Sequence, residues 1–295
     1  MSDRVRLVTL NLLTRRSADG PSRHAVVKQV LPGLHADVVA LQEVTRTGKI
    51  DQAADLLGAD FTIVDLPGGD PTNGGECLAA RWPIVRVHVL DQPLHVESAR
   101  PSPRAAAVAV EISGPDSIGA LLVVHHKGTY ELNHEHVREQ QALATARFVE
   151  DLLRDRPDLP AVLLGDFNAA PNAASIRFLT GRQSLHGFSV RYEDAWPAIH
   201  RDEPGHTFEP RNPLVRAGQM PLERGRRIDY IMTRSGAHGP LLDVGDCRLI
   251  FTEPVNGVWA SDHYGILADF QRPEHRPGQW AEHIATEHGC DSSGR

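Results

Sequence analysis

The sequence contains little cysteine, and its cysteines form no pattern. Cys77, Cys247 and Cys290 lie far apart in a chain of 295 residues. An odd number at these spacings predicts neither a disulfide framework nor a CxxC metal site. The chain also has no apolar run long enough to span a membrane. Residues 1–13 lack the long apolar stretch of a signal peptide, so we expect a cytoplasmic protein without a membrane span.

Positive charge is also scarce. The chain has 31 Lys and Arg against 38 Asp and Glu, which gives a net charge of −7. A protein that coats nucleic acid by charge alone needs clustered Lys and Arg, so this composition excludes that class. It leaves open an enzyme in which a metal ion supplies positive charge at one site. One local group of arginines is either a solvated loop or a phosphate-facing surface, and its members are Arg211, Arg216, Arg224, Arg226 and Arg227.

The remaining composition is typical of a soluble globular protein, with 41% hydrophobic and 23% charged residues. Short β-branched runs predict strands at residues 4–10, 38–41, 61–64, 77–80, 84–90, 105–112, 120–125, 161–164, 228–232, 246–251 and 266–270. Helices are expected at residues 21–35, 50–57 and 133–154. Because strands predominate and occur at both ends, we predict an α/β fold of two packed mixed sheets flanked by helices. Residues 1–272 would form one domain, and residues 273–295 a polar tail that is either a peripheral helix or disordered.

Polar side chains stand where several of the apolar runs end. They are Asn11, Glu43, His125, His126, Asp166, Asn168, Asp229, Asp262 and His263. A strand that leaves the core can hold such a side chain rigidly at the rim of its sheet. One residue of this kind is usually solvated or forms a turn. Six strand ends that all carry Asn, Asp, Glu or His predict a single convergent site.

Four segments carry a resemblance to a known family. LQEV, GDFNAAP, RIDYI and SDHYGI occur in this order, and together they resemble the endonuclease/exonuclease/phosphatase superfamily, which includes deoxyribonuclease I and the inositol polyphosphate 5-phosphatases. GECLAARWPI is similar to a further strand of the family. The resemblance runs from about residue 4 to residue 270. It implies a four-layer α/β sandwich, which agrees with the fold expected from the strand pattern.

The resemblance also implies a metal site. Glu43 is a hard oxygen donor and the main candidate ligand for Mg²⁺, which takes one or two carboxylates and fills its octahedron with water and substrate phosphate. Mn²⁺ is the expected substitute. Asn11 would lie beside Glu43 as a neutral ligand or a phosphate contact. Asp262 resembles the carboxylate on the metal side of the family site.

The catalytic residues follow from the same motifs. Asp166 is expected to accept the proton of the attacking water, and Asn168 to orient that water or bind a phosphate oxygen. His263 is expected to donate to a non-bridging phosphate oxygen. To do so it must be charged, which requires a carboxylate partner that raises its pKa. In the family this partner is the Asp of the I-D-Y motif, here Asp229.

Three further assignments depend on the alignment. Where many relatives read N-T-H-L, this chain reads VHHK, which makes His126 the family histidine and leaves His125 without an inherited role. Glu76 matches the acid that pairs with this histidine in deoxyribonuclease I, so Glu76 and His126 are expected to meet. Since consecutive strand residues face opposite sides of a sheet, only one of the two histidines enters the cleft. Apart from the alignment, Arg227, one of the local group of arginines, is expected to contact the substrate.

The predicted function is metal-dependent hydrolysis of a phosphate ester, with phosphodiesters of DNA or RNA as the leading substrate class. One rival is a small-molecule or lipid phosphoester, which the acidic net charge favours. Another is a binding module that has kept the fold without catalysis. No protein partner is evident. Specificity is expected to lie in loops over the sheet rim, at residues 66–75, 90–104, 181–187 and 207–223.

Overall fold

The computed structural model describes residues 3–67, 72, 74–94 and 103–280. Its elements in chain order are β1 (Val5–Asn11), α1 (Gly20–Val30), the 3-10 helix η1 (Leu31–Leu34), β2 (Val38–Val44), α2 (Gln52–Leu57), β3 (Thr62–Asp65), β4 (Gly75–Ala80), β5 (Ile84–Pro93), β6 (Arg104–Ser113), β7 (Ala120–Lys127), α3 (Glu135–Leu153), β8 (Ala161–Asp166), α4 (Ala174–Leu179), β9 (Tyr192–Asp194), α5 (Ala195–Ile199), α6 (Pro213–Ala217), β10 (Asp229–Gly236), β11 (Gly239–Pro240), β12 (Asp243–Ile250) and β13 (Gly265–Gln271).

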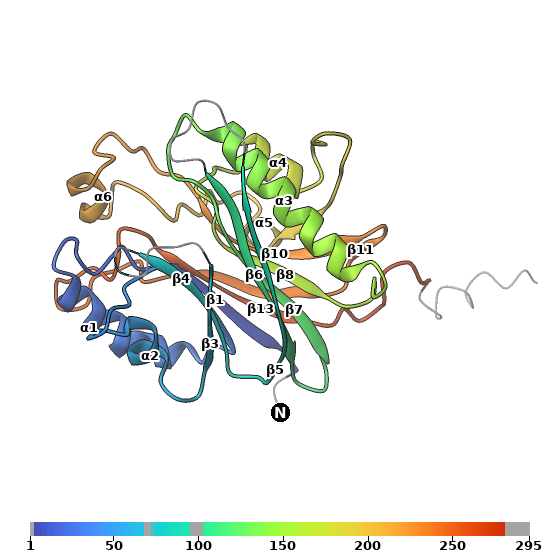
Figure 1. Ribbon diagram of the computed structural model, residues 1–295, viewed down its shortest axis with the longest axis horizontal. Helices are drawn as coiled ribbons and strands as arrows, with labels where there is room; N and C mark the ends of the chain where they lie inside the picture. Colours follow the sequence, from blue (N-terminus) through green and yellow to red (C-terminus); the bar gives the residue numbers. More distant parts are fainter. Residues whose placement is uncertain (1–2, 68–71, 73, 95–102, 281–295) are drawn as a thin grey trace, which may run out of the picture.

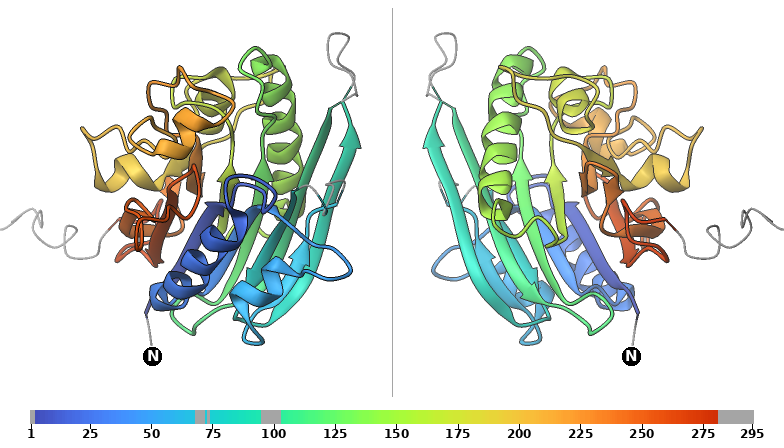
Figure 2. Two further views of the ribbon diagram at one scale, coloured as in Figure 1. Left: turned by 90° about the vertical axis from the view of Figure 1, so that its left-hand side faces the viewer. Right: turned by 90° about the vertical axis from the view of Figure 1, so that its right-hand side faces the viewer.

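The described strands form two mixed sheets. One has six strands in the order β12-β13-β1-β2-β4-β3, and the other has seven, in the order β11-β10-β8-β7-β6-β5 with β9 beside β10. Figure 1 shows α1 and α2 on one side of the paired sheets and α3 and α4 on the other. The outer edge position of β5 is visible in both side views of Figure 2. The predicted four-layer sandwich is confirmed.

Three apolar clusters separate the four layers. The central one joins the facing sides of the two sheets and includes Leu7, Val123 and Leu164. A second lies between the seven-stranded sheet and α3, and a third between the six-stranded sheet and α1 with α2. Because each central strand is buried on both faces, its sequence is apolar throughout instead of alternating. The sequence therefore predicts a strand such as β7, but it does not indicate which of its side chains point between the two sheets.

Strand direction brings the predicted polar residues to one edge. β1 runs parallel to β2, and β7 runs parallel to β8. β10 is antiparallel to β8, with Asp229 opposite Asp166. The carboxyl ends of β1, β2, β7 and β8 and the start of β10 therefore meet at the same rim of the sandwich.

The predicted helices correspond to α1 with η1, to α2 and to α3, while α4, α5 and α6 were not predicted. After β13, residues 272–280 form bends and turns. Arg272 donates to the carbonyl oxygen of Ile118 at 2.7 Å, and Arg276 forms an ion pair with Asp158. The rest of the predicted tail, residues 281–295, lies outside the described residues. Within the described part of the chain, no helix is both long and apolar enough to cross a membrane.

Candidate active site

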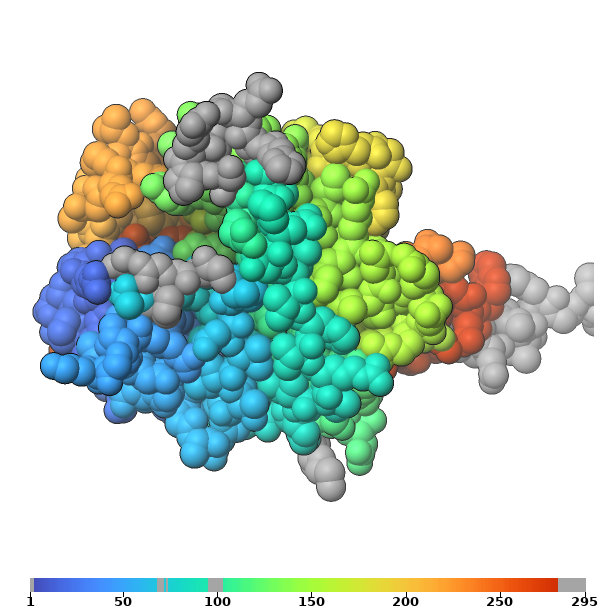
Figure 3. Space-filling view, in the orientation of Figure 1, coloured from blue at the N-terminus to red at the C-terminus, as the bar shows by residue number. Residues whose placement is uncertain are grey.

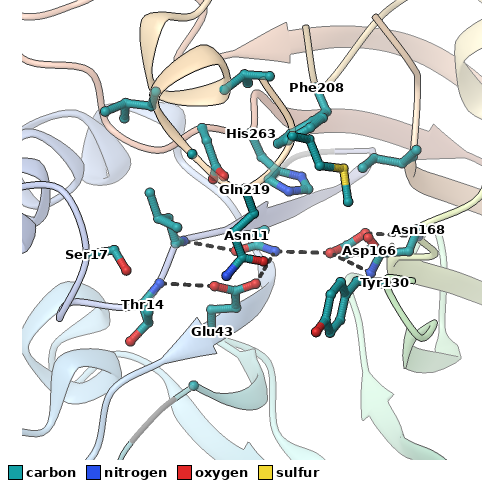
Figure 4. A pocket seen from close by; sticks show the side chains of 18 of the residues that line it. Asn11, Thr14, Ser17, Glu43, Tyr130, Asp166, Asn168, Phe208, Gln219 and His263 are labelled. Atoms are coloured by element: carbon teal, nitrogen blue, oxygen red, sulfur yellow. Dashed lines mark hydrogen bonds between the residues drawn. The ribbon is translucent and has the colours of Figure 1, made fainter. Parts of the chain in front are cut away.

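Asn11 links two carboxylates at the rim. Its Nδ2 donates to Glu43 Oε1 and to Asp166 Oδ2, each at 3.0 Å, and its Oδ1 accepts from the amide of Leu13 at 2.9 Å. Figure 4 shows Asn11 between the two acids, with His263 above them. The amide thus joins the ends of β1, β2 and β8 in one hydrogen-bonded unit. We call Asn11, Glu43, Asp166, Asp229 and His263 the floor.

Glu43 has a backbone conformation that favours glycine, with φ at 58°. It lies where the pairing of β2 with β4 shifts register between Leu41 and Val44, which marks a bulge. Such a conformation costs about 1–3 kcal/mol and is found mostly at functional sites. Burial alone would raise the pKa of Glu43, but Lys127, the Asn11 amide and the Thr14 N–H together lower it to about 2. Glu43 is therefore an anion at the cleft.

Asp166 is fixed by the turn that follows β8. Asn168, with φ at 52°, donates its backbone N–H to Asp166 Oδ1 at 3.0 Å and its Nδ2 to Oδ2 at 3.2 Å. Just before it, a Cβ at Gly165 would lie 1.9 Å from the carbonyl oxygen of His126, so only glycine permits this approach of β7 to β8. Burial raises the pKa of Asp166, and repulsion from Asp229 raises it further. This shift brings the carboxylate closer to the range of a general base near neutral pH.

Asp229 and His263 form the predicted pair. His263 Nδ1 lies 3.0 Å from Asp229 Oδ2, and both side chains are buried. Burial alone would lower the pKa of His263, but the charge of Asp229 and this hydrogen bond raise it to about 10. The imidazole is thus charged, and with Nδ1 bound to Asp229, its Nε2 is left to donate to a ligand in the cleft.

The donor atoms at the rim fit a divalent metal at Glu43 and Asp262. Both side chains line the cleft. Burial raises the pKa of Asp262, and the nearby carboxylate of Glu43 adds to this rise. A hard cation bound by both acids would remove that repulsion. The Asn11 Nδ2 donates to the two carboxylates, and its Oδ1 accepts one hydrogen bond from the Leu13 amide. One lone pair of Oδ1 is left to bind a metal or a substrate.

A second arrangement of possible ligand atoms is present. One oxygen of Asp166, one of Asp229 and one nitrogen of His263 all lie within 4.8 Å of one another. Within this group, the hydrogen bond between His263 Nδ1 and Asp229 Oδ2 is the acid–base contact that the sequence predicts. Glu43 and Asp262 are the metal ligands expected from the sequence.

The predicted contact between Glu76 and His126 is wrong. The side chain of His126 faces α3, where its Nδ1 lies 3.0 Å from Thr145 Oγ1, and its ring lies tilted against Phe167 with a centroid distance of 4.8 Å. Glu76 instead lies 3.5 Å from Lys127 Nζ. The alternation along β7 explains the error, because His126 shares its face with Leu122 and Val124 while Lys127 shares the inner face.

The geometry does not favour the prediction that Arg227 contacts the substrate. Arg227 is buried, bonds Asp194 Oδ2 at 2.6 Å and stacks over the ring of Tyr230. The preceding residue, Arg226, lines the cleft and bonds Glu223 at 2.8 Å. In both cases the predicted side chain points away from the cleft, and an adjacent residue, Lys127 or Arg226, lines it.

The rim opens into a cleft of about 820 Å³. In Figure 3 the surface is hollowed between the blue N-terminal segment and the orange segment that carries α6. Of the predicted specificity loops, residues 207–223 contribute most of the lining. We call their lining residues, together with Arg226, the wall; they are Phe208, Leu214, Val215, Ala217, Gly218, Gln219, Met220 and Arg226. Residues 68–71, 73 and 95–102 of two other loops lie outside the described part.

Two residues of the cleft, Thr14 and Tyr130, were not predicted, whereas the position of Lys127 at the end of the VHHK run marks it in the sequence as a further possible cation. Thr14 donates its backbone N–H to Glu43 Oε2 at 3.1 Å, and Tyr130 lies at the mouth with 55% of its surface exposed. Lys127, at the end of β7, lies 3.4 Å from Glu43 Oε1. Neither Thr14 nor Tyr130 belongs to a strand end, so the sequence carries no signal for them.

Known proteins share both the sequence pattern and the fold. The profile described as the endonuclease/exonuclease/phosphatase family matches residues 8–263. A D. rerio TDP2 structure, complexed with a single-strand DNA product, is 17% identical, with a TM-score of 0.70 over 92% of this chain and 100% of that one.

Two further structures have the same fold. The human Nocturnin catalytic domain with bound sulfate is 17% identical (TM-score 0.70, over 92% of this chain and 96% of that one), and an endonuclease/exonuclease/phosphatase from Bacteroides vulgatus is 19% identical (TM-score 0.69, over 92% and 99%). No curated protein sequence matches the chain.

Proposed function

The chain belongs to the endonuclease/exonuclease/phosphatase family, and from this premise we propose that it hydrolyses phosphodiesters with the help of Mg²⁺. As a member of this family it is a phosphoesterase. One observation carries the finer proposal: the Asn11 amide joins Glu43 to Asp166 in the same cleft that holds the Asp229–His263 pair. This arrangement supports the proposal, because the reaction needs a metal-binding carboxylate, a general base and a phosphate donor around one point.

The residues divide the work between them. Asp166 accepts the proton of the attacking water, which its raised pKa suits it to do. His263 donates from Nε2 to a non-bridging oxygen, and Asp229 keeps the ring charged and oriented. Asn168 holds Asp166 in place and orients the water. Glu43 and Asp262 would hold the metal with Asn11 beside them, and Mg²⁺ bound there would supply Lewis-acid chemistry for the phosphoryl oxygen.

A nucleic-acid phosphodiester is the substrate class that we favour. The cleft has a volume of about 820 Å³, which leaves room for more than one phosphate group, and one structure of the same fold contains a single-strand DNA product. A small-molecule or lipid phosphoester remains the rival, and Mn²⁺ the alternative ion. The cytoplasmic location and the domain boundary at residue 272 stay predictions from the sequence.

Bis-(p-nitrophenyl) phosphate tests the reaction. Hydrolysis should require added Mg²⁺ or Mn²⁺, stop with a chelator, and return when the metal is restored. Undiminished turnover in metal-free buffer would overturn the mechanism, and binding of phosphate without turnover in any metal would leave only a binding module. Single-stranded DNA, RNA and a panel of phosphomonoesters then separate the substrate classes. Turnover of the phosphomonoesters alone would contradict the nuclease proposal.

A further inference from the structure

Lys127 ends β7 on the side that faces the cleft. Its Nζ lies 3.4 Å from Glu43 Oε1 and 3.5 Å from Glu76 Oε1, and 20% of its side chain is exposed. It lines the same cleft as the floor. An ammonium group has three donors, and at most two are directed at these carboxylates. Both contacts are at the long end of hydrogen-bonding distance, so neither acid holds the group tightly.

The register of β7 and β8 places the Lys127 ammonium beside Asp166, the proposed general base. Lys127 is the register partner of Asp166, and Asp166 is the partner of Asp229. Neighbouring strands lie about 4.8 Å apart, and register partners point to the same face. The three side chains therefore form a row along the rim, with Asp166 in the middle. Since His263 binds Asp229, Lys127 and His263 lie on opposite sides of Asp166.

The two histidines before Lys127 do not supply a cation here. His125 points between the sheets and lies 2.7 Å from Gln42 Nε2, while His126 faces α3. Burial lowers the pKa of His125 to about 3 and that of His126 to about 4, so both rings are neutral. The Lys127 ammonium, flanked by the carboxylates of Glu43 and Glu76, is therefore the cation that β7 brings to the cleft.

We propose that Lys127 is the second phosphate donor of the site, contacting a non-bridging oxygen of the substrate from the side of Asp166 opposite His263, with Glu76 as its positioning residue. The proposal rests on the proposed phosphoesterase function. The competing explanation is that Lys127 only neutralises Glu43 and Glu76. The two explanations differ in what happens when one acid is removed together with the lysine, and this difference gives the test.

The first measurement is the binding of inorganic phosphate in magnesium buffer by calorimetry, alongside kcat and KM for bis-(p-nitrophenyl) phosphate. Lys127→Met should weaken phosphate binding at least tenfold, because it removes a charge-assisted hydrogen bond. It should also lower kcat about a hundredfold, as for the loss of one preorganised donor. Lys127→Arg should recover part of both. Lys49→Met, at an exposed lysine outside the cleft, is the matched control and should match the wild type.

The second measurement separates donor from counter-ion. If Lys127 only balances charge, the Glu76→Gln/Lys127→Met double variant should recover phosphate binding and kcat to within about threefold of the wild type. We expect no recovery, and recovery would overturn the proposal. Wild-type phosphate affinity in Lys127→Met would overturn it as well. Failure of the wild type to turn over any phosphoester would instead refute the proposed function, while the phosphate titration would still test Lys127.

Glu76 has its own prediction as a positioning residue. Glu76→Gln should raise KM more than it lowers kcat, because the ammonium becomes less well placed without being lost. In the Lys127→Met background the same change should have no further effect. An additional loss there would show that Glu76 acts independently of Lys127. Thermal unfolding of each variant checks that the buried substitutions leave the fold intact.

Discussion

The floor and the wall of the cleft are built in different ways. The floor side chains lie at or beside strand ends, with Asp229 at the start of β10 and His263 just before β13, and hydrogen bonds of about 3.0 Å hold them. The wall comes from an irregular segment around the five-residue helix α6 and presents mostly apolar side chains, among them Leu214 and Met220. A rigid polar floor suits one chemical step, whereas an irregular wall suits the selection of what is attached to the phosphate. The comparison predicts that floor substitutions act on every substrate alike and wall substitutions do not.

The largest effect should come from Asp166→Asn. This change keeps the shape of the side chain but removes the proton acceptor, so kcat should fall a hundredfold or more. The loss should be of similar size for bis-(p-nitrophenyl) phosphate and for the best natural-type substrate, since the floor contacts only the reacting phosphate.

Steady-state kinetics on both substrates measure this, with Asp158→Asn as the control because Asp158 pairs with Arg276 away from the cleft. A loss of kcat for only one of the two substrates would contradict the prediction that floor substitutions affect every substrate alike.

An intermediate effect is expected at the metal. Glu43→Gln removes the main anionic ligand, so the Mg²⁺ concentration for half-maximal activity should rise about tenfold or more. Calorimetric titration of Mg²⁺ into the protein should show the same loss of affinity without any substrate. Glu253→Gln, at an exposed glutamate paired with Arg211, is the matched control. An unchanged Mg²⁺ affinity would show that the ion binds elsewhere, with the group of Asp166, Asp229 and His263 as the next candidate.

The same contrast explains what the sequence could predict. Floor residues were recognisable because a polar side chain at the end of an apolar run is unusual, and several such ends imply one site. The sequence does not show which face of β7 carries His126, because Val123 and Val124 are both buried although they lie on opposite faces of the strand. With both faces apolar, the alternation that would fix the register disappears.

Local geometry was beyond prediction for another reason. The left-handed backbone of Glu43 and the bulge around it depend on the pairing of β2 with β4, which are separated by a helix and a further strand. The wall presents no periodic pattern at all, so its shape follows from packing that only the folded chain defines. Phe208, for example, lies against the His263 ring with a centroid distance of 4.9 Å.

The smallest effect should come from Arg226, the cation of the wall. Arg226 already forms an ion pair with Glu223, and its guanidinium lies over the ring of Phe208. Its attraction for a substrate phosphate is therefore partly neutralised. Arg226→Ala should weaken binding of single-stranded DNA a few-fold and reduce the slope of log affinity against log salt by about 0.7, the value for one phosphate contact on a single strand. Fluorescence anisotropy over a range of salt concentrations measures both. Arg227→Ala is the internal contrast, because this arginine is buried against Asp194. Its loss should lower the free energy of unfolding in urea and leave the salt slope of the folded protein unchanged. An unchanged slope in Arg226→Ala together with a reduced slope in Arg227→Ala would restore the original prediction for Arg227 and remove Arg226 from the wall.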